Sequence, residues 1–178
     1  MEKGYNLSSF YIMLIFLSLA IYSLYSNINN KWLLAPPNYV LLLGSVIAFI
    51  LAMKGFKYKK NLLAKTRSWT TLILSSLLVI SLTLTILFTL AASSLGANEH
   101  IKTVHSPDGK YQIDFYQWDA GAAGTFGIRG ELNGPLWFKK RIYLERRIET
   151  VEVEWESNER VLINNHTLNL NDGETYGY

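Results

Sequence analysis

Three long uncharged stretches fill most of the first 98 residues, and they constrain the fold more than any other feature. They cover residues 4–30, 32–53 and 68–98. A bilayer core of roughly 30 Å is crossed by about 20 apolar residues in a helix, and each stretch is long enough. The pattern predicts a membrane α-helical region of three transmembrane helices, at about residues 7–25, 33–53 and 69–92.

Charge divides the chain at residue 98. Residues 1–98 hold eight basic residues and one acidic residue, whereas residues 99–178 hold nine basic and thirteen acidic residues. The acidic C-terminal part disfavours nucleic acid as a partner, because phosphate binding needs a basic surface. The chain has no cysteine, which excludes disulfides, thiol chemistry and cysteine-ligated zinc.

The segment between the second and third predicted spans carries the strongest signal of orientation. Its six basic residues are accompanied by no acidic one: Lys54, Lys57, Lys59, Lys60, Lys65 and Arg67. Basic residues near span ends stay in the cytoplasm, so we expect this loop and the N-terminus to be cytoplasmic and the C-terminal domain to be extracytoplasmic. The same cluster could also attract anionic lipid headgroups. The third span is longer than a signal-peptide core, so we expect an uncleaved anchor.

Beyond residue 105 the apolar residues alternate with polar ones, which is typical of half-buried strands. We expect residues 99–105 to be a linker and residues 106–178 to form a small all-β antiparallel meander domain of five or six strands. Ser106 to Lys110 (SPDGK) is a turn sequence, and Asn164-Asn165 predicts a two-residue hairpin. Gly127 and Gly130 inside a strand predict a bulge or a close backbone approach.

A Gly-rich connection at residues 119–124 is the best candidate for a binding loop, because loops on rigid sheets commonly carry binding. The candidate residues are Asp119, Gly121, Gly124 and Arg129. A phosphate cradle is the alternative, but no Gly-Lys-Ser/Thr and no convincing helix follow.

Candidate catalytic and metal-binding groups are weak. Glu152, Glu154 and Glu156 share one face of a predicted strand, but acid–base pairs need environments that separate their pKa values. We expect a solvated face, or one opposite Lys139 and Arg141. The three histidines lack zinc-motif spacing, and no serine lies in a Gly-x-Ser-x-Gly elbow. We therefore predict no enzyme activity, no metal and no cofactor. The histidines are His100, His105 and His166.

The region from about residue 106 to 178 contains the segments SPDGKYQIDFYQWDAGAAGTFGIRGEL, RIYLERRIETVEVEW and VLINNHTLNL. On these segments it resembles a family of uncharacterised Gram-positive bacterial membrane proteins with a C-terminal domain of unknown function. The chain departs from the family pattern at Asn165, where a hairpin glycine is usual, and at Ala122-Ala123, in the region of a glycine pair. The resemblance implies a bacterial cell-membrane protein and no particular activity.

We therefore expect a multi-pass membrane protein that presents its β-domain for binding at the bacterial envelope, with the lipid bilayer and an envelope protein as partners. Two alternatives are an accessory subunit of an envelope enzyme or transporter, and a membrane immunity or self-protection protein.

Overall fold

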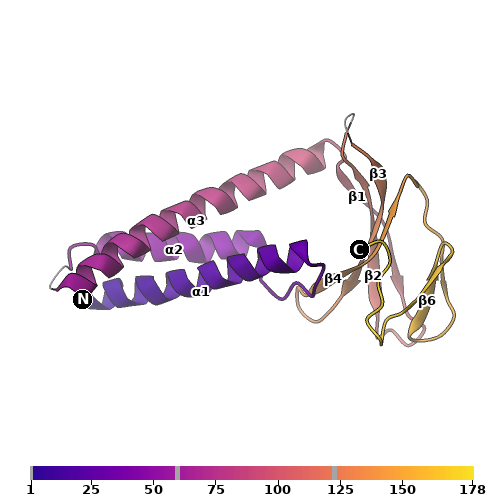
Figure 1. Cartoon of the computed structure of the whole chain (residues 1–178), viewed down its shortest axis with the longest axis horizontal. Coiled ribbons are helices and arrows are strands. Elements are labelled where there is room, and N and C mark those ends of the chain that lie inside the picture. Colours follow the sequence, from indigo (N-terminus) through magenta and orange to yellow (C-terminus); the bar gives the residue numbers. More distant parts are fainter. Residues whose placement is uncertain (1, 59–60, 122–123) are drawn as a thin grey trace. The chain divides into compact units, whose positions relative to one another are not determined.

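The computed structural model describes residues 2–58, 61–121 and 124–178, which fall into two compact units (Figure 1). The helical unit comprises Met1–Tyr25 and Ala35–Thr89, and the β unit comprises Ser26–Leu34 and Leu90–Tyr178. The predicted fold class is confirmed: long apolar helices precede an antiparallel β-domain.

The described residues form three long helices: α1 (Glu2–Ile28), α2 (Asn38–Gly55) and α3 (Leu62–Ser94). Each is long and apolar enough to cross a membrane. Helix α2 begins at Asn38, later than the predicted start of the second span at about residue 33. The reason is the pair Pro36-Pro37: Ala35 and Pro36 each precede a proline, and a residue in that position is pushed out of the helical region into an extended conformation.

The basic segment is more helical than the predicted loop. Lys54 lies in α2, Lys57 in the connecting turn, and Lys65 and Arg67 in α3. Helix α3 starts early because the Asn61 side chain accepts a hydrogen bond from the Ala64 N–H at 2.9 Å, as an N-cap residue does. Lys59 and Lys60 lie outside the described residues.

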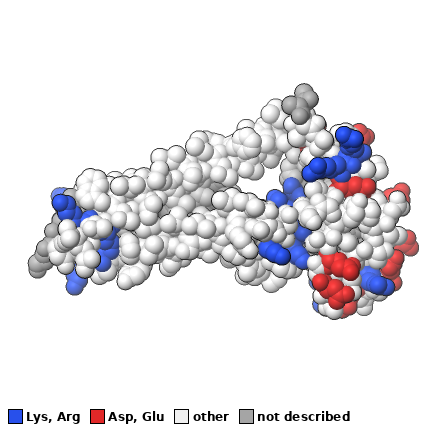
Figure 2. All heavy atoms as spheres, in the orientation of Figure 1, with Lys and Arg blue, Asp and Glu red and all other residues white. Residues whose placement is uncertain are grey.

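Small side chains are buried where the helices pack. On α2 they are Gly44, Ser45, Ala48, Ala52 and Gly55, and on α3 they are Ala64, Ser68, Thr71 and Ser75. A Cβ added to Gly44 would enter the ring of Phe16 on α1, so this contact requires glycine. Large apolar side chains cover the outside, and Figure 2 shows uncharged surface along most of the helices' length.

In the β unit, the described residues form seven strands in two antiparallel meanders. Sheet A has the order β1-β2-β3-β4 and sheet B the order β5-β6-β7. Their bounds are β1 (Asn98–His105), β2 (Gln112–Asp119), β3 (Phe126–Asn133), β4 (Lys139–Arg146), β5 (Val153–Trp155), β6 (Arg160–Ile163) and β7 (His166–Asn169). Residues 99–105, predicted to be a linker, belong to β1, because they pair with β2 from Asn98↔Trp118 to His105↔Gln112.

Apolar side chains of both sheets form one core. Ile113, Phe115 and Ile128 from sheet A and Val161 and Ile163 from sheet B are fully buried within it. The core also receives Trp32, from the connection between α1 and α2. This connection joins the sheet: the Leu33 N–H donates to the Lys139 carbonyl at 2.7 Å, and the Lys139 N–H donates back at 3.4 Å.

Local turn predictions are confirmed. Ile163 pairs with His166 across Asn164-Asn165, with Asn164 at φ 52°. A β-bulge lies between Gly130 and Glu131, and Gly109 adopts φ 71° in the SPDGK turn.

Glu152, Glu154 and Glu156 are exposed, as predicted. Their expected position opposite Lys139 and Arg141 is wrong: β5 pairs with β6 in sheet B, whereas both basic residues lie on β4 of sheet A. The turn after β4 leads the chain into a second sheet instead of adding β5 to the first.

Candidate functional site

The predicted binding loop and Arg129 lie apart in the structure. Asp119 ends β2, and Gly121 and Gly124 lie in the β2–β3 connection; all three are exposed. The Asp119 carboxylate accepts the Gly121 N–H at 2.8 Å. Asp119 pairs with Phe126, whereas Arg129 pairs with Tyr116. Since successive strand residues point to opposite faces, Arg129 and Asp119 point to opposite sides of the sheet. Ala122 and Ala123 lie outside the described residues.

Arg129 instead belongs to a group of charged side chains on the face of sheet A that points away from the core. This charged cluster consists of Asp114, Arg129, Glu131, Lys139 and Arg141. The strand register assembles it: Asp114 lies opposite Glu131, and Glu131 opposite Arg141. Three adjacent strands therefore place carboxylates and cations side by side.

The cluster is closely paired. Arg129 Nε lies 2.9 Å from Glu131 Oε1, and Lys139 Nζ lies 3.7 Å from Asp114 Oδ2 and 3.6 Å from Glu131 Oε2. The Arg129 and Lys139 cations also lie 5.4 and 5.6 Å from the Tyr116 ring centroid. Each carboxylate thus contacts a cation, and both cations contact one aromatic ring.

The surroundings keep both signs of charge ionised. Burial tends to raise the pKa of Asp114, but hydrogen bonds from Asn133, Thr103 and Gln112, together with Lys139, bring it below its usual range. Burial likewise tends to lower the pKa of Lys139, but Glu131, Tyr116 and Asp114 raise it above its usual range. General acid–base catalysis needs a pKa near the working pH, and both groups are shifted away from neutrality.

A small polar cavity borders the cluster. It has a volume of about 60 Å³, and it is lined by Ser26, Asn27, Asn30, Lys31, Leu33, Glu131, Lys139 and Arg141. Arg141 Nη2 donates to Asn27 Oδ1 at 3.2 Å, which ties β4 to the last turn of α1. Pockets for small molecules usually measure about 300–1,000 Å³, and a water takes about 30 Å³. This cavity therefore suits a few waters or one small anion.

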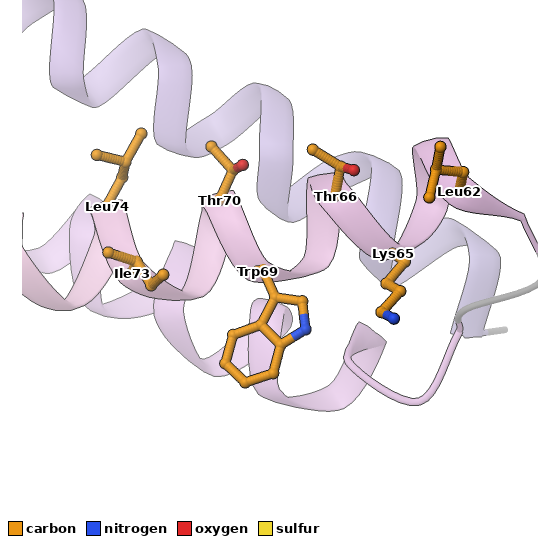
Figure 3. A pocket seen from close by; sticks show the side chains of 7 residues that line it. All are labelled: Leu62, Lys65, Thr66, Trp69, Thr70, Ile73 and Leu74. Carbon is orange, nitrogen blue, oxygen red and sulfur yellow. The ribbon is translucent and has the colours of Figure 1, made fainter.

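A larger open groove of about 510 Å³ runs along one side of α3 (Figure 3). Its lining residues are Leu62, Lys65, Thr66, Trp69, Thr70, Ile73 and Leu74. Lys65 and Trp69 point to the same side, one helical turn apart, and the Trp69 ring meets Phe56 edge-on at 5.0 Å. A basic and an aromatic residue at a helix end are typical of a membrane–water interface. All its lining residues belong to α3, so the groove is an open face of a single helix.

Sequence reasoning missed the role of Asn164. Besides forming the turn, its Nδ2 donates to Tyr143 Oη at 3.1 Å and to Glu145 Oε2 at 2.9 Å, and its Oδ1 accepts the Glu152 N–H at 2.9 Å. Tyr143 also donates to Glu145. Burial, and then this hydrogen bond, raises the pKa of Tyr143, and the same bond lowers the pKa of Glu145. The turn residue therefore joins sheet B to sheet A.

The histidines are distributed over two sheets. His100 and His105 lie in β1 and His166 in β7, where the His166 ring stacks on Tyr176 with 3.5 Å between centroids. Within the described parts of the chain, no three His, Asp or Glu side chains are placed to hold a metal ion.

Comparison with known proteins gives a family and no activity. No curated protein and no solved structure matches the chain. A family of unknown function, DUF5412, matches residues 60–178, which include α3 and all the strands. Because this match covers more than half of the chain, the protein belongs to the DUF5412 family.

Proposed function

We propose that this chain is an integral membrane protein that holds its β unit at the outer surface of a cell membrane, where the β unit binds an envelope partner. Its three helices cross the bilayer, and the N-terminus and the basic segment remain in the cytoplasm. The action is binding and not catalysis.

One observation carries the proposal: the α1–α2 connection and the C-terminal strands fold together as one unit. Leu33 forms a β-bridge with Lys139, and Trp32 packs on the core. If three helices cross a membrane, the first connection and the segment after the third helix must lie on the same side. The shared fold of these distant segments supports three crossings.

The direction of crossing follows from charge. Lys54 and Lys65 lie at the ends of α2 and α3 that face each other along the chain, whereas the β unit's segments adjoin the other ends of these helices. Such basic clusters are retained in the cytoplasm. The β unit is then extracytoplasmic.

The exposed β2–β3 connection remains the candidate contact surface. The Asp119 carboxylate accepts the Gly121 N–H at its start, and the flanking strands pair along their whole length from Gln112↔Asn133 to Asp119↔Phe126. Arg129 is not part of this surface, because it is paired on the other face. The pKa values of Asp114 and Lys139 are shifted away from neutrality, which supports binding over proton transfer.

Cysteine labelling tests the topology, because the chain has no cysteine of its own. We expect a membrane-impermeant maleimide to label Asn158→Cys on intact cells and Lys57→Cys only after lysis. Both positions are exposed, which makes them a matched pair. The reverse pattern would place the β unit in the cytoplasm and overturn the proposal.

A photo-crosslinking residue at Asp119 tests the binding surface in living cells. We expect a discrete adduct from position 119 and none from Asp172, an exposed acidic residue near the C-terminus. A large transporter or enzyme in the adduct would identify the chain as an accessory subunit. Equal adducts from both positions would contradict the assignment of the loop.

A further inference from the structure

The connection between β3 and β4 exposes large apolar side chains. Leu136 is 82% exposed and Trp137 is 42% exposed. Leu136 also has φ 59°, in the left-handed region that a bulky residue rarely adopts. The backbone therefore holds a leucine outward at the cost of both strain and apolar exposure.

This connection is tied to the segment that leads into α2. The Trp137 indole Nε1 donates to the Leu34 carbonyl at 3.0 Å, and Leu34 is itself 46% exposed. The neighbouring bridge between Leu33 and Lys139 fixes the same two segments. Leu34, Leu136 and Trp137 together form one outward patch, here called the apolar tip.

The chain places the apolar tip close to where α2 begins. Leu34 is followed by α2 at Asn38, and four residues span at most about 14 Å. Tryptophan is enriched at membrane–water interfaces, where its ring is apolar and its N–H finds a polar partner. If α2 enters a bilayer at its first turn, the apolar tip lies within reach of the headgroup region.

The charges beside the apolar tip have the sign that a lipid surface favours. Lys139, Lys140 and Arg141 follow it directly, and residues 132–144 contain no acidic residue. Lys31 lies near Lys140, since burial and the Lys31 charge lower the pKa of Lys140. Basic residues near an anionic bilayer are attracted to its surface. The segment that leads from the apolar tip into β4 is thus basic, and of its three cations Lys139 is paired with Asp114 and Glu131.

We propose that the apolar tip inserts into the interface of the bilayer that α2 crosses and holds the β unit against anionic phospholipid headgroups. This inference rests on the proposed membrane function. It adds a second attachment to the bilayer besides the helices, which restricts the orientation of the β unit relative to the surface.

Spin labels on single cysteines test the inference in the full-length chain, reconstituted in vesicles containing phosphatidylglycerol. The variants are Leu136→Cys, Asn158→Cys and Phe88→Cys, all at exposed positions. The measurement is the ratio of collision rates with oxygen, which enters the bilayer, and with a water-soluble nickel complex. We expect the ratio of oxygen to nickel collisions to be several-fold higher for a label at position 136 than for one at position 158. The label at position 88 should give the highest ratio.

The three positions separate the possible failures. Equal ratios at 136 and 158, with a high ratio at 88, would overturn the apolar tip while leaving the membrane function standing. A low ratio at 88 would overturn the proposed membrane function itself. Equal thermal unfolding of Leu136→Cys and the parent chain in detergent verifies that the variant is folded.

Discussion

The helical unit and the β unit place their large side chains in opposite ways. In the helical unit Phe88 is 76% exposed while Ser75 is fully buried, and in the β unit Phe115 is fully buried while Glu154 is exposed. Water drives apolar groups inward, whereas in lipid the apolar exterior costs nothing and small residues allow close helix packing. The helical unit therefore has the side-chain distribution that lipid favours, and the β unit has the distribution that water favours.

Replacing one phenylalanine in each unit gives the largest expected contrast. Phe115→Ala should cost about 3–5 kcal/mol of unfolding free energy in the β unit, since it empties a fully buried site. This approaches the whole stability of many small domains, so we expect the β unit to lose its near-UV circular dichroism at a much lower temperature.

The matched variant is Phe88→Ala, on the outer face of α3. Its ring faces the surroundings before and after the helices separate, so we expect little change in the unfolding of either unit in detergent. Equal losses of stability from the two substitutions would show that the two units do not differ in where they bury large apolar side chains.

A bulky residue at a close helix contact tests the helical half of the comparison. Gly44→Leu should destabilise the packing of α1 and α2 by about 1–3 kcal/mol, because a side chain at 44 would overlap the Phe16 ring. The control is Gly4→Leu, where a Cβ meets open space. Unfolding of both variants by added dodecyl sulfate in mixed micelles provides the measurement, and an unaffected Gly44→Leu protein would remove the small-residue explanation.

Acid should affect the β unit through Asp114. Its pKa is lowered in the folded state, so the stability that it contributes is present above its unfolded pKa, near 4, and is lost as the pH falls through the folded value. Asp114→Asn should cost roughly 1–2 kcal/mol at neutral pH and reduce the loss of stability below pH 4.

Glu154→Gln, at an exposed position, serves as the control for Asp114→Asn. It should keep the parent's dependence of melting temperature on pH. If both variants lose melting temperature with falling pH as steeply as the parent does, the charged cluster does not stabilise the β unit.

The smallest effect is expected at the hairpin that joins the sheets. Asn164→Gly keeps the positive φ but removes the hydrogen bonds to Tyr143 and Glu145, so we expect a loss of about 1 kcal/mol. Asn165→Gly should change stability by less than about 0.5 kcal/mol. Urea unfolding followed by Trp fluorescence measures the stability of both variants. Equal changes in the free energy of unfolding would show that Asn164 acts only as a turn residue.

Local patterns were enough to predict the long helices, most strands and the turns. Apolar length indicated the helices, alternation indicated the strands from Gln112 onward, and Asn164-Asn165 indicated a hairpin. Strand β1 was not predicted, because its polar residues, such as His100 and Lys102, do not alternate clearly with apolar ones.

The candidate site was harder to predict because it depends on which face of the sheet each side chain occupies and on pairing between segments that are distant in the sequence. Strand alternation does carry part of the signal: with Phe126 and Ile128 facing the core, Arg129 must point away from it. The charged cluster needs the register of β2, β3 and β4, which no single segment encodes. The pairing of Leu33 with Lys139 joins segments separated by two helices, and local sequence patterns contain no trace of it.

The same pairing bears on modularity. The DUF5412 match starts at residue 60, whereas the β unit draws Ser26–Leu34 from before that boundary. A fragment cut at residue 60 would lack the Trp32 side chain on the core and would leave the backbone of Lys139 without its partner. The β unit is therefore not an independent module of residues 60–178. A transfer of the β unit to another protein must include the connection between α1 and α2.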